Sequence, residues 1–282
     1  MVTKHGLTAK KKLGQHFLVD GFVLEKIVAG ADVGGDDLVI EIGPGVGALT
    51  QALARRAGHV IAVELDKTLV PVLEGLFDSE AVTVVQGDIL KIDLPSIVQP
   101  YSRMNIKAVA NLPYYITTPV IFYLLEGEIV FESITVMVQK EVANRMAAKP
   151  GTKDYGALTL AIQYYADATL VANVPVNCFM PRPGVDSAVV RLGVHKEPRV
   201  DTDREMFFKV VKAAFGKRRK TLVNCLEGFG YSKKELEEMF EKLGISSNSR
   251  GEVLDIFAFG EIARVLMCRG EAAAACALGG TH

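Results

Sequence analysis

The chain has 282 residues, of which 49% are hydrophobic and 23% are charged. These proportions are typical of a globular protein, so collagen-like, low-complexity and wholly disordered chains are excluded. The 32 basic and 33 acidic side chains give a net charge of -1. A nucleic-acid partner would therefore have to bind local basic patches, because the chain as a whole has no positive field.

Cysteine and histidine are used sparsely. The four cysteines, at positions 178, 225, 268 and 276, do not form a disulfide framework. None of the five histidines lies at ligand spacing from a cysteine, so no metal site is expected. The uncharged run from Ala108 to Leu125 contains Asn111, Pro113 and Pro119 and is expected to form a buried strand, a turn and a helix rather than a membrane span. No secretory signal is found, and a cytoplasmic protein is expected.

Short β-branched runs alternate with helical patterns over the first two-thirds of the chain. Buried parallel strands are expected at Leu38–Ile42, Val60–Val63, Val82–Gln86, Lys107–Ala110 and Ile134–Val138. Helices are expected near 20–30, 48–57, 67–77, 119–126 and 155–165. No crossover helix fits between Thr169–Val174 and Ser187–Val194, which are expected to be antiparallel strands. The order predicts an α/β fold of Rossmann-like type, with a mostly parallel sheet and antiparallel strands at one edge.

The pattern changes after His195 to helical periodicity alone. Helices are expected at 206–215, 220–226, 232–243 and 254–267, and Ser232 with Glu235 forms a capping box. Lys196–Val200, which contains Pro198, is the expected boundary. We therefore expect a first domain over residues 1–198, a small helical domain over 199–270 and a disordered tail over 271–282.

A glycine-rich turn follows the first expected strand. Gly43-x-Gly45-x-x-Ala48, with Glu64 located 21 residues after Gly43, matches a dinucleotide fingerprint. Glu64 ends the second strand and can accept hydrogen bonds from both ribose hydroxyls of NAD or of S-adenosylmethionine. Asp88 follows the third strand and can accept one from an adenine amino group. These residues predict a nucleoside pocket at the carboxyl edge of the sheet; a tight turn without a ligand and a solvated strand-end acid are the alternatives.

The segment after the fourth strand, Asn111-Leu112-Pro113-Tyr114, resembles the (N/D)-P-P-(Y/F) motif of methyltransferases that act on exocyclic amino groups. The N6 lone pair of adenine is delocalised into the ring. Acceptors on its two N–H groups, here the Asn111 amide oxygen and a neighbouring main-chain carbonyl, can turn this nitrogen towards tetrahedral geometry. Tyr114 can stack on a base extracted from its helix. The alternative is a strand-exit turn whose proline and tyrosine only pack.

Further stretches make the resemblance to one family specific: Lys12–Leu18, Gly43–Gly45, Phe179–Ala188 and Phe215–Leu222. From about Leu7 to Leu226 the chain resembles the ribosomal RNA adenine N6,N6-dimethyltransferases of the KsgA (RsmA) type. The resemblance implies a class I methyltransferase fold with S-adenosyl-L-methionine as cofactor. It also implies dimethylation of N6 of two adjacent adenosines in a hairpin loop near the 3′ end of 16S rRNA. The expected partner is this RNA in the small (30S) ribosomal subunit or its precursor, and the protein is expected to be a monomer.

The same resemblance implies roles for individual residues. Cofactor contacts are expected from His16, Leu18, Gly43, Gly45, Glu64, Asp88 and Asn111. The target base is expected to meet Asn111, Leu112, Pro113 and Tyr114, with Phe179 stacking on its opposite face. The family often has Asn where this chain has His16. Without the resemblance, Phe179 is expected in the core, and Gln15–Leu18 only leads into a helix.

Basic residues are concentrated in two stretches. Residues 1–14 hold four lysines and no acid, and residues 196–234 hold eleven basic residues against five acids. Contacts to RNA phosphates are expected from Lys10, Lys11, Lys12, Lys217, Arg218, Arg219 and Lys220. The alternative for each stretch is a solvated surface.

Three other functions are weighed against this expectation. An NAD-dependent oxidoreductase explains the glycine turn and Glu64 but leaves Asp88 and the Asn111–Tyr114 motif without a role. A non-catalytic RNA-binding assembly factor does not need an intact pocket. The antibiotic-resistance dimethyltransferases of large-subunit RNA usually carry Ser where Pro44 stands and Ile where Leu112 stands, so the chain favours the small-subunit type.

Overall fold

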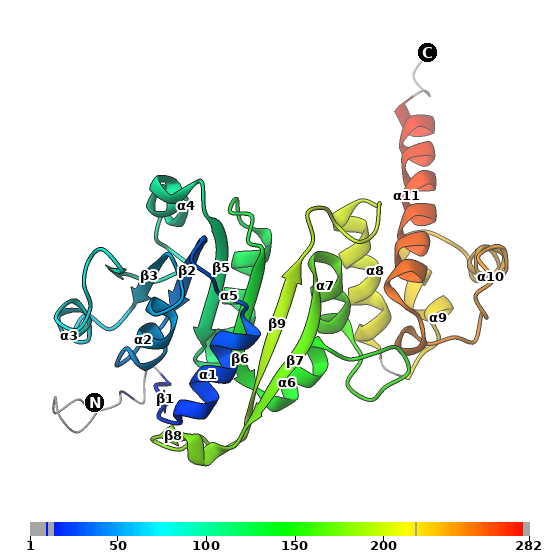
Figure 1. Cartoon of the computed structure of the whole chain (residues 1–282). Coiled ribbons are helices and arrows are strands. Elements are labelled where there is room, and N and C mark those ends of the chain that lie inside the picture. The colour runs from blue at the N-terminus through cyan, green and yellow to red at the C-terminus, as the bar shows by residue number, and fades with distance from the viewer. Residues whose placement is uncertain (1–9, 11–13, 218, 279–282) are drawn as a thin grey trace. The chain divides into compact units, whose positions relative to one another are not determined.

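The computed structural model describes Lys10, residues 14–217 and residues 219–278, with side chains described as far as Met267. The chain divides into two compact units (Figure 1). One consists of Met1–Ala147 and Asp167–Lys196, and the other of Ala148–Ala166 and Glu197–His282. In the described residues no helix has the length and apolar character that crossing a membrane requires.

The first unit is built on a seven-stranded sheet with the order β4-β3-β2-β5-β6-β9-β7. The strands are β2 (Asp37–Ile42), β3 (His59–Glu64), β4 (Val82–Gln86), β5 (Asn105–Asn111), β6 (Ser133–Gln139), β7 (Ala166–Val174) and β9 (Ser187–Val194). β2 to β6 are parallel, and β9 pairs antiparallel with β6. The expected mixed sheet is confirmed, with its antiparallel part at one edge.

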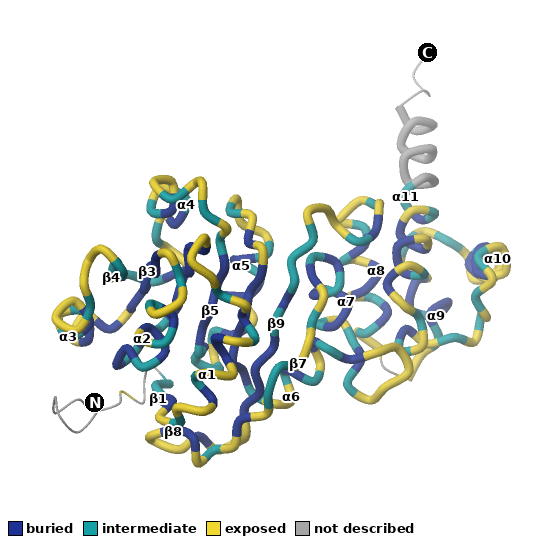
Figure 2. Tube along the Cα trace, in the orientation of Figure 1, coloured by how far each residue is buried: buried dark blue, intermediate teal, exposed yellow. Residues whose placement is uncertain are grey.

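Both faces of the central strands are buried, as expected for parallel strands between layers of helices. All residues of β2 and β3 are buried (Figure 2). α1 (Gly21–Gly30) and α2 (Ala48–Ala54) contribute Ile27 and Leu53 to a cluster with Val39 and Val60. The other helices of this unit are α3 (Val70–Glu74), α4 (Leu94–Val98), α5 (Thr117–Glu126) and α6 (Lys140–Met146). The uncharged run from Ala108 to Leu125 forms β5, a turn and α5, as predicted.

A second, two-stranded sheet joins segments that are distant in sequence. β1 (Phe17–Leu18) pairs antiparallel with β8 (Phe179–Met180), so that Leu18 lies opposite Phe179. Strands of two residues carry no periodicity, so this sheet could not be predicted from the sequence. It fixes the segment before α1 against the loop that leads into β9.

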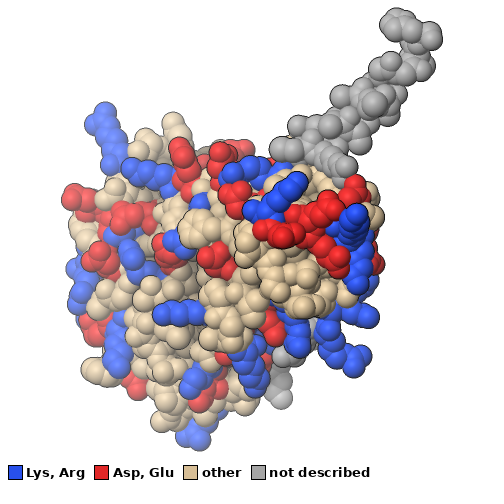
Figure 3. Space-filling view, turned by 90° about the vertical axis from the view of Figure 1, so that its right-hand side faces the viewer, with Lys and Arg blue, Asp and Glu red and all other residues tan. Residues whose placement is uncertain are grey.

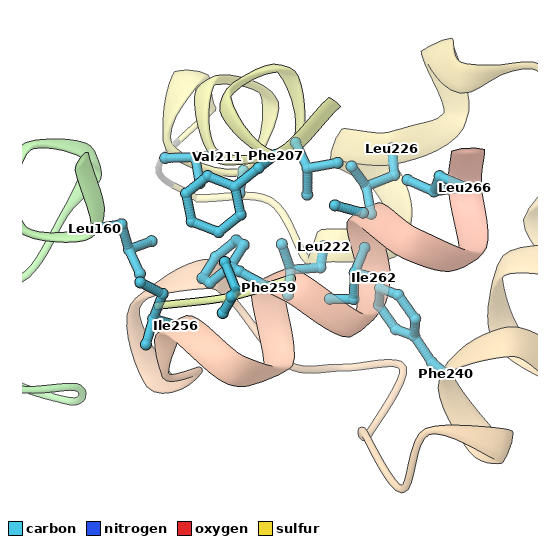
Figure 4. Close-up of a cluster of buried hydrophobic side chains, with 14 of the residues drawn as sticks. Leu160, Phe207, Val211, Leu222, Leu226, Phe240, Ile256, Phe259, Ile262 and Leu266 are labelled. Carbon is cyan, nitrogen blue, oxygen red and sulfur yellow. The ribbon is translucent and has the colours of Figure 1, made fainter. Parts of the chain in front are cut away.

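The second unit is helical. Its helices are α7 (Ala157–Tyr165), α8 (Arg204–Gly216), α9 (Leu222–Leu226), α10 (Lys233–Lys242) and α11 (Ile256–Leu278). Phe207, Leu222 and Phe259 are fully buried in its core (Figure 4). The predicted capping box at α10 is present, because Ser232 Oγ accepts from the Glu235 N–H while Glu235 Oε2 accepts from the Ser232 N–H.

Two segments differ from the expected domain limits. Residues 148–166, expected in the first domain, belong to the helical unit, where Leu160 lies in the core and the Tyr155 hydroxyl donates to the Leu254 carbonyl at 2.8 Å. The segment expected to be a disordered tail is helical as far as Leu278, consistent with its many alanines, the residue with the highest helix propensity. Residues 279–282 lie outside the described part of the chain.

Candidate functional site

A pocket opens at the carboxyl edge of the parallel strands β2, β3, β4 and β5. Residues at the ends of these strands and just after them line it, namely Gly43, Gly45, Glu64, Asp88, Asn111, Pro113 and Tyr114. Gly14–Leu18 provides a further part of the wall. The empty space is about 1060 Å³ including the open mouth. The structure thus brings together the cofactor residues that the sequence placed at this edge.

The turn after β2 depends on glycine. Gly43 and Gly45 have φ values of +71° and +58°, a region that residues with a Cβ atom rarely adopt. A Cβ atom on Gly45 would lie 3.0 Å from the Phe17 ring. The turn therefore presents main chain to the pocket, and the Gly45 N–H donates to Glu64 Oε2 at 3.0 Å.

Both carboxylate oxygens of Glu64 accept hydrogen bonds from main-chain N–H groups. Its second oxygen, Oε1, accepts from the Asp66 N–H at 2.7 Å, and the residue is only 4% exposed. Burial raises the pKa of this carboxyl group, while the two N–H donors act in the opposite direction. Each carboxylate oxygen has a further lone pair, so Glu64 can also accept hydrogen bonds from ligand hydroxyls.

Asp88 lies at the end of β4 on the pocket wall. Its Oδ1 accepts from the Leu90 N–H at 3.1 Å, and its Oδ2 lies 3.7 Å from the Lys91 ammonium. The side chain is 32% exposed. The turn therefore orients the Asp88 carboxylate, which can still accept a hydrogen bond from a ligand in the pocket.

Glu41 is a pocket residue that the sequence analysis did not single out. It is 1% exposed, and no hydrogen-bond partner of its Oε2 is found among the described residues. Burial, with a smaller contribution from the Glu64 charge, raises the pKa of Glu41 from 4.5 to about 8. The available signal was an acid within the otherwise apolar strand Leu38–Ile42, where a charge is costly unless it is neutralised.

The Asn111 amide has a defined orientation. Its Nδ2 donates to the His16 main-chain carbonyl at 3.0 Å. Because a carbonyl oxygen only accepts, the amide nitrogen must point to His16, and Oδ1 is the end that can accept from a ligand. This is the orientation that the proposed contact with an amino group requires.

Tyr114 and His16 lie together in the pocket. The Tyr114 hydroxyl is 2.8 Å from Ser187 Oγ, and burial raises the pKa of this phenol. The His16 ring is stacked at 6.1 Å from the Tyr114 ring, with an angle of 24° between the planes. His16 Nδ1 is 2.8 Å from the Pro181 carbonyl oxygen. The loop from 181 to 187 therefore orients both rings.

Two residues that were expected to contact the target base do not present their side chains to the pocket. Phe179 is 3% exposed and belongs to the hydrophobic cluster of the sheet, where its strand partner Leu18 also packs. It is absent from the described pocket wall, so stacking on a base would require its ring to leave the core. The Leu112 side chain is likewise buried, at 1% exposure, which leaves only its main chain for a ligand. The alternative interpretation of Phe179, as a core residue, matches this structure.

Only some of the basic residues that were expected to contact RNA phosphates lie in the described part of the chain. The Lys10 ammonium donates to Asp66 Oδ1 at 2.6 Å and to the Thr68 hydroxyl at 3.0 Å. Although burial acts to raise it, hydrogen bonds from Lys10, Thr68 and Gln15 hold the pKa of Asp66 at about 2. Lys10 therefore has an intramolecular partner, a role that differs from the expected phosphate contact. Lys11, Lys12 and Arg218 lie outside the described residues.

Lys217, Arg219 and Lys220 are exposed in the turn between α8 and α9. On the face drawn in Figure 3, basic and acidic side chains are intermixed. Because the net charge is only -1, attraction to RNA must come from local groups such as this turn.

Several pocket residues were not predicted. Gln15, Phe17, Ile89 and Tyr115 line the wall, and Tyr115 is 58% exposed. The only signal for them is adjacency to the expected site residues. In the described residues there is no group of three or more His, Cys, Asp or Glu side chains that could hold a metal ion.

Comparison with known proteins relates this chain to ribosomal RNA methyltransferases. The sequence model of the family described as "Ribosomal RNA adenine dimethylase" matches residues 6–264. "Ribosomal RNA small subunit methyltransferase A" of Lachnoclostridium phytofermentans is 49% identical over 273 residues, covering 94% of each chain. The protein of the same name from Clostridioides difficile is 45% identical over 272 residues, covering 94% of this chain and 93% of its own.

Two solved structures share the fold. A dimethyladenosine transferase from Plasmodium falciparum superposes with a TM-score of 0.74 and 26% identity, covering 91% of this chain and 98% of its own. The 23S rRNA methyltransferase ErmE gives a TM-score of 0.70 and 26% identity, with coverage of 89% and 99%.

Proposed function

Because this chain belongs to the ribosomal RNA adenine dimethylase family, we propose that it dimethylates N6 of two adjacent adenosines in a hairpin loop near the 3′ end of 16S rRNA. The RNA would be bound within the small (30S) subunit or its precursor, in the cytoplasm. The names of the similar bacterial proteins support the choice of subunit. The observation that carries the proposal is the Asn111 amide, whose Oδ1 is left to accept from an amino group beside the Tyr114 ring.

S-adenosyl-L-methionine would be the methyl donor. Glu64 would accept from the ribose hydroxyls, Asp88 from the adenine amino group, and the open turn at Gly43 would lie along the nucleoside. The buried Glu41 Oε2 has no hydrogen-bond partner among the described residues and can form a hydrogen bond to a polar group of the cofactor. When bound, the cofactor supplies an activated methyl group.

The residues of the chain prepare the amine. Asn111 Oδ1 and a neighbouring main-chain carbonyl accept from the two N–H groups of N6, which weakens delocalisation of the lone pair into the ring. Tyr114 stacks on the base, and its contact with Ser187 fixes the ring plane. Stacking of a base on an aromatic ring contributes roughly 1–3 kcal/mol. The protein thus lowers the barrier to methyl transfer by orienting the base and its amino group.

Binding of the ribosomal RNA would draw on exposed basic residues of the helical unit, at the turn of Lys217, Arg219 and Lys220. Each phosphate contact releases counterions, so this part of the affinity falls as salt rises. Lys10 pairs with Asp66, whose N–H donates to Glu64. We expect the protein to act as a monomer.

The proposal is tested by incubating the protein with labelled cofactor and either unmethylated small subunits or large subunits. Label in the small subunit alone supports it, whereas label in the large subunit alone supports the activity named for ErmE, the second candidate that the shared fold favours. Calorimetry with S-adenosylhomocysteine and NADH separates both from an oxidoreductase. Binding of NADH alone would refute the proposed cofactor.

A further inference from the structure

Tyr115 is a second tyrosine of the pocket wall and directly follows Tyr114 in the chain. It is 58% exposed, whereas Phe17 of the same wall is 7% exposed. No hydrogen bond of its hydroxyl group is found among the described residues. A Cβ atom placed on Gly14 would lie 3.4 Å from two carbons along one edge of the Tyr115 ring. One edge of the ring therefore lies against the Gly14 main chain, while more than half of the residue stays accessible.

The two tyrosines are directed to different parts of the pocket wall. They belong to one 3₁₀ turn, Tyr114–Ile116, in which successive side chains point about 120° apart because there are three residues per turn. The Tyr114 hydroxyl lies 2.8 Å from Ser187 Oγ, whereas the Tyr115 ring lies beside Gly14. A base stacked on Tyr114 thus leaves the Tyr115 ring available to a different group.

The proposed substrate supplies such a group. Two adjacent adenosines are to be modified, but the single Asn111 amide can hold one target base at a time. Extraction of that base from its stack deprives the bases on either side of a stacking partner. A flanking base is joined to the target through one phosphodiester unit, so it stays close to the part of the wall next to Tyr114. Every base has a π-face, and an aromatic side chain can replace the lost partner whatever the base is.

We propose that the Tyr115 ring stacks on the nucleobase next to the target adenosine, an inference that rests on the proposed function. Because the RNA backbone runs in one direction through the site, the ring meets the flanking base on the same side, 5′ or 3′, in every transfer. For one adenosine of the pair this base is the other adenosine, and for the second it is the next loop nucleotide. Stacking uses the face of the base rather than its amino group, so a neighbour that is already dimethylated is also accepted.

The test combines two changes, Tyr115→Ala in the protein and removal of one flanking base from the RNA. Small subunits are reconstituted with 16S rRNA that carries an abasic site directly 5′ or directly 3′ of the target adenosine. Single-turnover methylation of that adenosine is measured with enzyme in excess but below saturation. On intact RNA, Tyr115→Ala should be slower by roughly 5- to 150-fold, the range that stacking of one base implies. An unchanged rate would overturn the inference.

The cycle distinguishes stacking from a general loss of activity. On one side of the target, the abasic site should slow the wild type by a similar factor and slow Tyr115→Ala little further, because the ring and the base are the two partners of one contact. On the other side the two losses should multiply. Losses that multiply on both sides would contradict the proposal. Tyr115→Phe should recover the rate lost in Tyr115→Ala, since it keeps the ring, and a phenylalanine variant as slow as the alanine variant would argue against stacking.

Two controls exclude other roles of the ring. S-adenosylhomocysteine should bind wild type and Tyr115→Ala equally in a calorimeter; a loss of cofactor affinity as large as the loss of rate would mean that the ring covers the cofactor, and would overturn the inference. Phe22→Ala is the matched control, because Phe22 is 71% exposed in the same compact unit and is not part of the described pocket wall. Its effect should be independent of both abasic sites.

Failure of the proposed function and failure of this inference give different results. If the wild type does not methylate intact small subunits, the proposed function fails. If it methylates them and Tyr115→Ala does so at the same rate, only the inference on Tyr115 fails.

Discussion

Glu41→Gln should change how the stability of the first unit depends on pH. Burial raises the pKa of Glu41 from 4.5 to about 8 in the folded protein. Between these values the unfolded chain releases a proton that the folded chain retains, so the free energy of unfolding falls as pH rises. Below pH 4.5 both states are protonated, and above pH 8 both are ionised, so the dependence is confined to this window. The full shift corresponds to about 5 kcal/mol.

A glutamine removes this titration while it keeps the shape of the side chain. From pH 5.5 to pH 7.5 the wild type should lose roughly 2–3 kcal/mol that the variant keeps. Any constant cost of burying the amide cancels when the two pH values are compared. The measurement is urea unfolding at both pH values, followed by NMR signals of β2 and β3 residues, because these report on the unit that contains Glu41. An equal difference between wild type and variant at both pH values would show that Glu41 is ionised in the folded protein.

Four other variants test separate features of the site and the fold. Asn111→Ala should nearly abolish single-turnover methylation while the thermal melt stays unchanged, because the amide positions the amine rather than the core; wild-type rate would refute its role. Glu64→Gln should weaken S-adenosylhomocysteine binding in a calorimeter about ten- to a hundredfold, since hydrogen bonds to charged groups contribute roughly 1.5–3 kcal/mol; unchanged affinity would refute the ribose contact. Phe179→Ala should lower the free energy of unfolding by roughly 3–5 kcal/mol, and a loss of RNA binding without a loss of stability would return the ring to the target site. Alanine at Lys217, Arg219 and Lys220 in the α8–α9 turn should flatten the salt dependence of RNA binding by up to roughly 0.7–0.9 log units per contact. Cofactor affinity is the control, and an unchanged slope would mean that these residues only form a solvated surface.

The sheet could be predicted because its strands are buried on both faces. Runs such as Leu38–Ile42 and Val60–Val63 are almost wholly apolar, and their alternation with helices leaves few possible topologies. The residues at the strand ends then meet at one edge, which is why Gly43, Glu64 and Asp88 were found together.

What the sequence did not predict depends on contacts between distant segments. The pairing of β1 with β8 involves two residues on each side and has no local pattern. It is this pairing that directs Phe179 into the core, whereas the family resemblance placed the ring against the base. The Lys10–Asp66 ion pair joins residues 56 positions apart, so a lysine expected to meet RNA binds an acid of its own chain. The orientations of Asn111 and His16 likewise depend on carbonyl groups that only the folded chain supplies.

The central claim is that this pocket dimethylates two adjacent adenosines of small-subunit RNA. Unmethylated small subunits are incubated with the protein and S-adenosylmethionine, and the 16S rRNA is then digested and its modified nucleosides are mapped by mass spectrometry. The account predicts N6,N6-dimethyladenosine at two neighbouring positions in a hairpin loop near the 3′ end, and none with Asn111→Ala. Methylation at another atom, at a single isolated adenosine or only in large-subunit RNA would contradict it.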